Sequence, residues 1–271
     1  MKLAVVTTYY NEVEIIGDVV EGLRANNTPF DFYLADDCSS KPPSAVLEEY
    51  GREPWFHYLR NEKNSGAVFG LNRAIRAAIE AGADLIAIND ADDIPYRNRF
   101  PDQLAAFRAD PELAIVGGAA DMVDYDSGAV LWQAHHATSH NEIRRNNRVN
   151  STFVHSTVIF RREVFEKAGF YNPSAYAYDY DMISRGLAAG FKAGNVASVV
   201  LKYNIRANSM SVSKRRTQIA SRMRVQLDHF DAANFWSYYG LARSIAAYIA
   251  PNNAATNAKT IAHRISAPGR N

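Results

Sequence analysis

The alternation of apolar, β-rich runs with amphipathic segments between residues 2 and 89 constrains the fold more than any other feature. The helix-like segments begin near Asn11, Pro42 and Gly66, each within a turn-forming stretch. Four short apolar runs indicate strands, at 2–8, 30–35, 55–60 and 85–89. Strands that alternate with helices in this way predict a mostly parallel sheet covered by helices on both faces.

Beyond residue 100 the pattern becomes less regular. We expect helices at 101–109, 162–168 and 181–189, and strands at 114–118, 156–160 and 197–205. Asp126-Ser127-Gly128 between two short apolar runs predicts a β-hairpin. The second half of the sheet should therefore be partly antiparallel.

Polar side chains follow three of the predicted strands at the point where each strand ends. The first strand leads into Thr8-Tyr9-Tyr10-Asn11-Glu12, the second into Asp36-Asp37, and the fourth into Asp90-Ala91-Asp92-Asp93. The carboxyl ends of parallel strands share one edge of a sheet, where ligands of open α/β folds bind. Clustered carboxylates repel one another unless a cation holds them, and oxygen ligands suit Mg²⁺ or Mn²⁺. The alternative is an ordinary acidic turn before the next helix.

Several other sites are excluded or disfavoured by their spacing. The chain has no Walker-type phosphate loop and no G-x-G-x-x-G after its first strand. His135, His136 and His140 have no cysteine or carboxylate at ligand spacing, which disfavours a zinc site. The single cysteine, Cys38, cannot form an internal disulfide, and this predicts a reducing, cytoplasmic compartment.

The charge of the chain is unevenly distributed. Residues 202–271 carry 11 Lys/Arg and 2 Asp/Glu, a net of +9, although the whole chain has a net charge of only +1. A basic helix is expected from residue 214, followed by an aromatic segment near Phe235. Three interpretations stay open for this tail. It contacts an anionic membrane through 212–249, as a peripheral protein at the inner face of the cytoplasmic membrane, it docks on its own acidic body, or it forms a dimer contact. No nucleic-acid-binding module accompanies the charge.

Seven segments, in order, resemble those of the family 2 glycosyltransferases, the inverting enzymes with the glycosyltransferase-A fold. They are Val5–Glu12, Ala35-Asp36-Asp37-Cys38-Ser39, Asn64-Ser65-Gly66 with Asn72, Asp90–Asp93, His155–Phe170, Ala177-Tyr178-Asp179-Tyr180-Asp181, and Tyr203–Ser211. Departures from the family pattern are Thr8 in place of proline, Gly70 in place of alanine, Tyr178 in place of glutamate and Arg206 in place of histidine.

The resemblance implies a role for each matching residue. The nucleotide-sugar site would comprise Thr8, Tyr10, Glu12, Asp37, Asn64, Gly66, Asn72, Asp90 and Arg206. Asp92 would bind Mn²⁺ or Mg²⁺, and Asp179 would be the general base. His155, Tyr178 and Asp181 would lie on the acceptor side, although Asp181 is better explained as a carboxylate in the first turn of a helix.

The resemblance also implies an organisation and a reaction. Residues 1–118 would bind the donor, 119–211 would form the acceptor-binding and catalytic half of the same α/β domain, and 212–271 would be a basic helical extension. The reaction would move a sugar from a nucleotide-diphosphate sugar, such as a UDP-sugar, to a hydroxyl of a glycan or lipid-linked acceptor in polysaccharide or cell-envelope biosynthesis. The alternatives are a non-catalytic sugar-nucleotide-binding protein and a sugar-phosphate nucleotidyltransferase. A nucleotidyltransferase would have a Gly-rich, basic loop after the first strand, and residues 7–11 contain no glycine or lysine.

Overall fold

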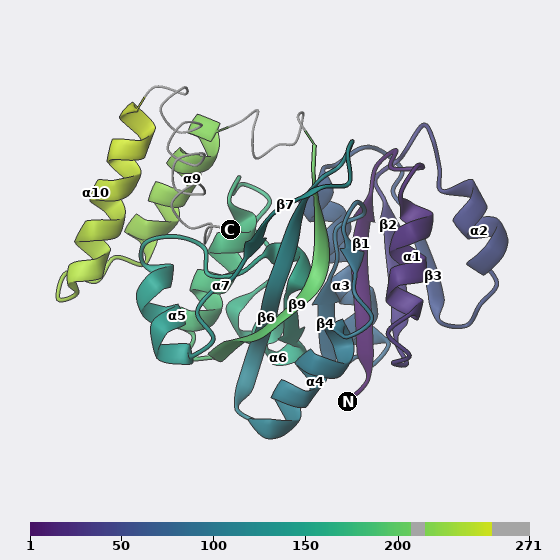
Figure 1. Cartoon of the computed structure of the whole chain (residues 1–271), viewed down its shortest axis with the longest axis horizontal. Coiled ribbons are helices and arrows are strands. Elements are labelled where there is room, and N and C mark those ends of the chain that lie inside the picture. The colour runs from purple at the N-terminus through teal and green to yellow at the C-terminus, as the bar shows by residue number, and fades with distance from the viewer. Residues whose placement is uncertain (207–214, 251–271) are drawn as a thin grey trace, which may run out of the picture.

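The computed structural model describes residues 1–206 and 215–250 of the chain. Figure 1 shows a central sheet flanked by helices, with two helices, α9 and α10, at one end of the molecule. The strands are β1 (Leu3–Tyr9), β2 (Asp31–Asp36), β3 (Phe56–Arg60), β4 (Leu85–Ile88), β5 (Ile94–Pro95), β6 (Leu113–Asp124), β7 (Val130–Ala134), β8 (Ile159–Arg161) and β9 (Lys192–Ile205). The helices are α1 (Ile16–Arg24), α2 (Ser44–Tyr50), α3 (Ala67–Glu80), α4 (Arg99–Ala109), α5 (His140–Asn147), the short 3₁₀ helix η1 (His155–Thr157), α6 (Arg162–Ala168), α7 (Tyr178–Ala188), α9 (Arg215–Asp228) and α10 (Phe235–Ile249).

In the described residues the strands form one nine-stranded sheet with the order β3-β2-β1-β4-β8-β6-β9-β5, and β7 pairs with β6. The first four strands in the chain are parallel to one another. Strand β8 is antiparallel to both β4 and β6, whereas β9 is parallel to β6. The predicted α/β fold, parallel in its first half and partly antiparallel in its second, is therefore confirmed.

The two faces of the sheet are buried by different helices because successive side chains of a strand point in opposite directions. In β1, Leu3 and Val5 pack with the apolar residues of α1, α2 and α4. Ala4 and Val6 of the same strand pack with those of α3, α6 and α7. These strands are buried on both sides, which explains their near-continuous apolar sequences.

Several elements differ from their predicted bounds. Strand β6 continues through Gly118 to Asp124, so the predicted domain boundary at residue 118 falls inside it. The predicted strand at 156–160 is a 3₁₀ turn followed by the short strand β8. Helix α7 begins at Tyr178, three residues earlier than predicted, and this places Asp179 in its first turn. Strand β5 and helix α5 were not predicted.

The basic segment of the tail forms α9, which packs between α7 and α10. Its Arg222 donates through Nε to Ser244 Oγ of α10 at 3.1 Å. None of the helices in the described ranges is both long and apolar enough to cross a bilayer. The predicted motif at Tyr203–Ser211 and the end of the extension, 251–271, fall partly or wholly outside the described residues.

Candidate active site

The three polar turns lie side by side at the carboxyl edge of the sheet. Strand β1 is flanked by β2 on one side and β4 on the other, with Tyr9 opposite Asp36. The turns are joined by main-chain hydrogen bonds, because Asp37 N–H donates to Tyr9 O at 2.9 Å and Asn89 N–H to Val6 O at 3.1 Å. The predicted juxtaposition of the three strand ends is therefore present.

The acidic turn after β4 is held by a buried asparagine and a buried arginine. Asn89 Nδ2 donates to the main-chain oxygens of Asp90 and Asp93, at 2.8 and 3.0 Å. Arg99 of α4 is fully buried and donates through Nη1 to Asn89 Oδ1 at 2.6 Å. Asn89 and Arg99 thereby fix the conformation of the turn. The buried guanidinium of Arg99 also offsets part of the negative charge of the carboxylates in the turn.

The carboxylates of this turn raise one another's proton affinity. Burial, followed by the charges of Asp90 and Glu12, raises the pKa of Asp92 to about 6, and Arg206 opposes the shift. Burial and the charges of Asp90 and Asp92 also raise the pKa of Asp93. Asp93 Oδ1 accepts a hydrogen bond from the main-chain N–H of Asn204 on β9 at 3.0 Å. Asp93 therefore ties the turn to β9, and the next helix, α4, begins only at Arg99.

The paired carboxylates after β2 have separate roles. Asp36 is fully buried, and although burial opposes its ionisation, hydrogen bonds from Ser39 and Tyr58 and the charge of Arg60 hold its pKa below the usual value. Asp37 accepts from Ser65 N–H and Gly66 N–H, both at 2.8 Å, and from Asn61 Nδ2 at 2.9 Å. Asp37 thus orders the loop that leads into α3, while its Oδ2, which among the described residues accepts only from Gly66 N–H, keeps one lone pair that can accept from a ligand.

A cluster of aromatic and acidic side chains faces the acidic turn from the second half of the sheet. His155 Nε2 lies 3.1 Å from Tyr171 Oη, and His155 Nδ1 lies 3.8 Å from Asp90 Oδ1. Burial opposes protonation of His155, but its contact with Asp90 and the charge of Asp179 outweigh burial and raise its pKa. The ring of Tyr178 meets His155 edge-to-face, with ring centroids 5.5 Å apart.

Asp179 shares this cluster with the carboxylates of the turn. Burial raises the pKa of Tyr178, and the charges of Asp90 and Asp179 both add to the shift. Tyr203 of β9 has a raised pKa for the same reasons, with Asp93, Asp90, Asp92 and Asp179 all contributing after burial. Residues from β4, α7 and β9 therefore converge on one half-buried acidic site.

Arg206 closes the other side of this site. Its Nη1 lies 2.6 Å from Glu12 Oε2, and its guanidinium stacks over the ring of Tyr125 at 4.1 Å from the ring centroid. The positive charge of Arg206 lowers the pKa of the Asp92 carboxyl and so opposes the effects of burial, Asp90 and Glu12.

Other predicted residues take up two kinds of position. Thr8, Tyr10, Asn64 and Gly66 lie at the same edge, and Tyr10, Asn64 and Gly66 are exposed. Asn72 instead donates to Tyr171 O at 2.8 Å and accepts from Tyr171 N–H at 3.0 Å. Asp181 pairs with Arg185 Nε at 2.9 Å, and Arg185 binds main-chain oxygens of Ala168 and Phe170. These contacts favour positioning roles for Asn72 and Asp181, whose predicted contacts with ligands stay predictions.

The family model described as "Glycosyl transferase family 2" matches residues 4–169. The chain belongs to glycosyl transferase family 2. The amylovoran biosynthesis glycosyltransferase AmsE of Erwinia amylovora is 30% identical over 167 residues, which span 61% of this chain and 60% of that relative. The uncharacterized glycosyltransferase YwdF of Bacillus subtilis is 24% identical over 82% of this chain and 83% of its own length.

Solved glycosyltransferase structures share the fold. S. aureus TarS in complex with UDP-GlcNAc superposes with a TM-score of 0.70 at 17% identity, over 92% of this chain and 72% of that chain. The mannosyltransferase PcManGT from Pyrobaculum calidifontis, in complex with GDP-Man and Mn²⁺, superposes with a TM-score of 0.65 at 16% identity, over 99% of this chain and 76% of that chain. The glycosyltransferase-A type of fold that the sequence predicted is therefore confirmed.

The carboxylates of this family 2 glycosyltransferase suit a hard divalent cation in their chemistry. Among residues 1–206 and 215–250 no three His, Cys, Asp or Glu side chains are arranged around a common metal position. Burial is the main cause of the raised pKa of Asp92, and the negative charges of Asp90 and Glu12 add to it. A cation there would take one or two protein oxygens and draw its other ligands from phosphate and water, as Mg²⁺ commonly does.

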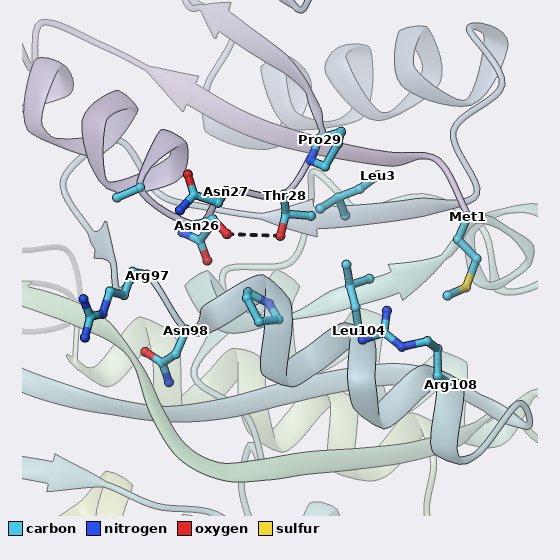
Figure 2. Close-up of a pocket in the computed structure, with 12 residues that line it drawn as sticks. Met1, Leu3, Asn26, Asn27, Thr28, Pro29, Arg97, Asn98, Leu104 and Arg108 are labelled. Carbon is cyan, nitrogen blue, oxygen red and sulfur yellow. Dashed lines mark hydrogen bonds between the residues drawn. The ribbon is translucent and has the colours of Figure 1, made fainter.

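A separate hollow of about 780 Å³ lies at the opposite edge of the sheet (Figure 2). It is formed by the start of β1, residues 25–29 and one side of α4, with Asn98 and Arg108 among its polar groups. No Asp, Glu or His lines this hollow in the described part of the chain. It therefore offers neither a general base nor metal ligands, and the candidate active site of the glycosyltransferase is the carboxylate edge.

Three residues of this site were not predicted. Tyr171 holds His155, and Ser156 Oγ accepts the Asp90 main-chain N–H at 2.8 Å. The role of the buried Arg99 could not be found from the sequence, because no short-range pattern links it to Asn89. Only the chain topology brings these residues under the acidic turn.

Proposed function

We propose that this family 2 glycosyltransferase moves a sugar from a nucleotide-diphosphate sugar to a hydroxyl group of a glycan or lipid-linked acceptor, with inversion at the sugar carbon. The observation that carries the proposal is the convergence of Asp90, Asp92 and Asp179 on Tyr178 and Tyr203, because the charges of all three carboxylates act on both phenols. A single site thus offers carboxylates on its donor side and one carboxylate on its acceptor side.

On the donor side, Asp37 would accept the ring N–H of a pyrimidine, and Thr8, Tyr10 and Glu12 would line the base and ribose. Asp92, with Asp90 beside it, would hold Mn²⁺ or Mg²⁺, which when bound neutralises charge on the leaving diphosphate. Arg206, whose charge acts on Asp92, would contact the same phosphates once its pairing with Glu12 is exchanged. Support for such a donor comes from the UDP-GlcNAc and GDP-Man bound to two proteins of the same fold.

On the acceptor side, Asp179 would take the proton of the attacking hydroxyl. The acceptor oxygen then forms its bond to the sugar carbon from the face opposite the diphosphate, and the bond from that carbon to the diphosphate oxygen breaks. Asp179 lies in the first turn of α7, where the partial positive charge of the helix N-terminus favours a carboxylate. His155 and Tyr178 would shape the acceptor side around it.

A donor screen tests the proposal without knowledge of the acceptor. Thermal unfolding is measured with UDP-, GDP- and dTDP-sugars, with and without Mn²⁺, and release of nucleoside diphosphate is then measured with glycan and lipid-linked hydroxyl acceptors. We expect one donor to stabilise the protein only with Mn²⁺ and to be turned over. Stabilisation without any release of nucleoside diphosphate would instead assign the site to a sugar-nucleotide-binding protein. The name of the relative AmsE refers to amylovoran biosynthesis, which supports an acceptor that belongs to a biosynthetic pathway.

A further inference from the structure

Helix α10 is oriented with its large apolar side chains away from the protein. The residues that it buries are small: Ser237, Gly240 and Ser244. The residues that it exposes are large and apolar or aromatic: Phe235, Trp236, Tyr238, Tyr239, Ile245, Tyr248 and Ile249, with exposures between 37% and 72%. A helix of a water-soluble domain normally shows the opposite arrangement. We call these seven residues the outer face of α10.

The small residues are what allow α10 to pack closely on the protein. A Cβ atom on Gly240 would lie 2.1 Å from the main-chain oxygen of Arg148, so only glycine permits this approach. Arg148 also donates to Ser237 Oγ at 3.0 Å and pairs with Asp231 at 3.1 Å. The inner face of α10 is therefore a specific contact, and the exposure of the outer face is a consequence of a defined orientation. Figure 1 places α10 at one end of the molecule, beyond α9.

The surface around the outer face is basic. Arg145 of α5 lies over the ring of Trp236, 5.5 Å from its centroid. Arg243 is exposed on α10, and Arg216 and Arg224 are exposed on α9. Of the two acidic residues in 215–250, Asp228 lies 3.8 Å from Arg224 and Asp231 pairs with Arg148. Residues 215–250 thus carry five arginines and two acidic residues, and both acidic residues are paired.

The positive charge near the outer face of α10 restricts which partner can cover this face. A second copy of the chain would bring the same cations against one another around a two-fold axis, and like charges oppose such pairing. Residues 251–271 contain three Lys/Arg, no Asp/Glu and only two large apolar side chains, Ile261 and Ile265. They supply too little apolar surface to cover seven large side chains, and they add to the positive charge. An anionic lipid surface satisfies both the apolar and the electrostatic requirement.

We propose that the outer face of α10 docks on an anionic lipid membrane, with its tyrosines and Trp236 at the level of the headgroups and Phe235 and Ile249 below them. Trp and Tyr are enriched at this depth because one end of each ring system is polar. The docking element is α10 and not the basic helix α9, which buries Ile219 and Val225 and exposes one large apolar side chain, Leu227. The inference goes beyond the transfer reaction and does not depend on it.

The position of α10 also connects the membrane to the candidate active site. Helix α9 packs on α7, and Ser221 Oγ of α9 accepts the main-chain N–H of Ala177 at 3.0 Å, two residues before Asp179. The start of α7 therefore lies at the same end of the molecule as α10. When α10 docks on a membrane, this end of the molecule faces the membrane.

Vesicle flotation of the full chain tests the proposal, without donor sugar or metal. Vesicles of phosphatidylcholine alone are compared with vesicles that also contain phosphatidylglycerol, and the triple variant Phe235→Ser, Tyr239→Ser, Ile249→Ser is compared with wild type. The matched control is Val130→Ser with Leu131→Ser on β7, which are exposed to a similar extent, at 56% and 49%. Circular dichroism verifies that each variant is folded.

We expect wild type and the β7 control to float with the anionic vesicles, and the triple variant to bind at least about tenfold more weakly. Replacing Arg216 and Arg243 with Gln should weaken binding to the anionic vesicles by roughly fivefold for each cation lost. Two results would overturn the proposal: no flotation of wild type even at low salt, or a wild-type dimer in sedimentation that the triple variant converts to monomer. The second result would assign the outer face to a copy of the chain. Neither result would bear on the transfer reaction.

Discussion

Arg206 and Glu12, which are 194 positions apart in the sequence, form an ion pair at 2.6 Å beside the acidic turn after β4. Glu12 belongs to the turn after β1, and Arg206 follows the end of β9. Both charges act on Asp92, Glu12 raising its pKa and Arg206 opposing that shift. The pair therefore sets the charge of the donor side of the site, and it offers a cation that a diphosphate can take over from Glu12.

Arg206→Gln should weaken binding of the nucleotide donor. A charge-assisted contact with phosphate contributes about 1.5–3 kcal/mol, so we expect KM for the donor to rise by roughly 10- to 100-fold. Titration of the donor in a nucleotide-release assay measures this change. Arg108→Gln, which removes an exposed arginine at the opposite edge of the sheet, serves as the charge-matched control and should leave KM unchanged. Equal KM values for the two variants would remove Arg206 from the donor site.

The Asp92 carboxyl should make the stability of the metal-free protein depend on pH. Its pKa is raised from 3.8 to about 6, so the folded state binds the proton more tightly than the unfolded state does. The stabilisation that this proton provides is complete below the unfolded pKa and is lost as the pH rises through 6. We expect Asp92→Asn to increase the free energy of unfolding at neutral pH by about 2 kcal/mol.

Urea unfolding in the absence of divalent cations, at acid and at neutral pH, measures this effect. Asp18→Asn, at an exposed position of α1, is the control for removal of a carboxylate away from the site. Added Mn²⁺ should stabilise wild type at neutral pH and have a much smaller effect on Asp92→Asn. A wild-type protein that is no less stable than Asp92→Asn at neutral pH would contradict the electrostatic account of the turn.

Asn64 and Asn72 belong to the same predicted motif, but we expect them to have different functions. Asn72→Ala removes both hydrogen bonds to the main chain of Tyr171 and leaves these groups without their partner. We expect a loss of about 2 kcal/mol in stability, measured by thermal unfolding. Asn64→Ala, at an exposed loop position, should leave stability unchanged and weaken donor binding. The reverse outcome, with a stable Asn72→Ala and an unstable Asn64→Ala, would rule out these assignments.

The first half of the fold could be predicted from the sequence because its information is local. Strands β1 to β4 are short apolar runs separated by amphipathic helices, and each was expected within one or two residues of its observed bounds. The continuation of strand β6 beyond residue 118 could not be predicted, because Gly117 and Gly118 suggest the end of a strand. In the structure these glycines lie mid-strand, where a Cβ atom would be 2.3 Å from Asn195 Oδ1 and 2.6 Å from Val200 Cγ2 respectively. Close packing, and not a turn, explains them.

In the candidate site, too, local features could be predicted from the sequence and long-range contacts could not. The carboxylates at the strand ends could be placed at one edge because parallel topology requires it. The contacts that hold these carboxylates in place could not be predicted. Arg99, Tyr171 and Asn72 act across long sequence separations, such as the 99 residues between Asn72 and Tyr171. The start of α7 was also placed too late, because Tyr178, Asp179 and Tyr180 lack an apolar helical pattern.

The most direct test of the account is the rate of sugar transfer by Asp179→Asn, with donor, Mn²⁺ and acceptor at saturating concentrations. Asp181→Asn lies one half-turn away in the same helix and is the matched control, since its carboxylate already pairs with Arg185. The account predicts that Asp179→Asn binds donor normally and loses transfer by about 10²- to 10⁴-fold, the usual contribution of a general base. Asp181→Asn should lose stability and retain transfer. Near-normal turnover by Asp179→Asn would contradict the assignment of the base, and with it the proposed mechanism.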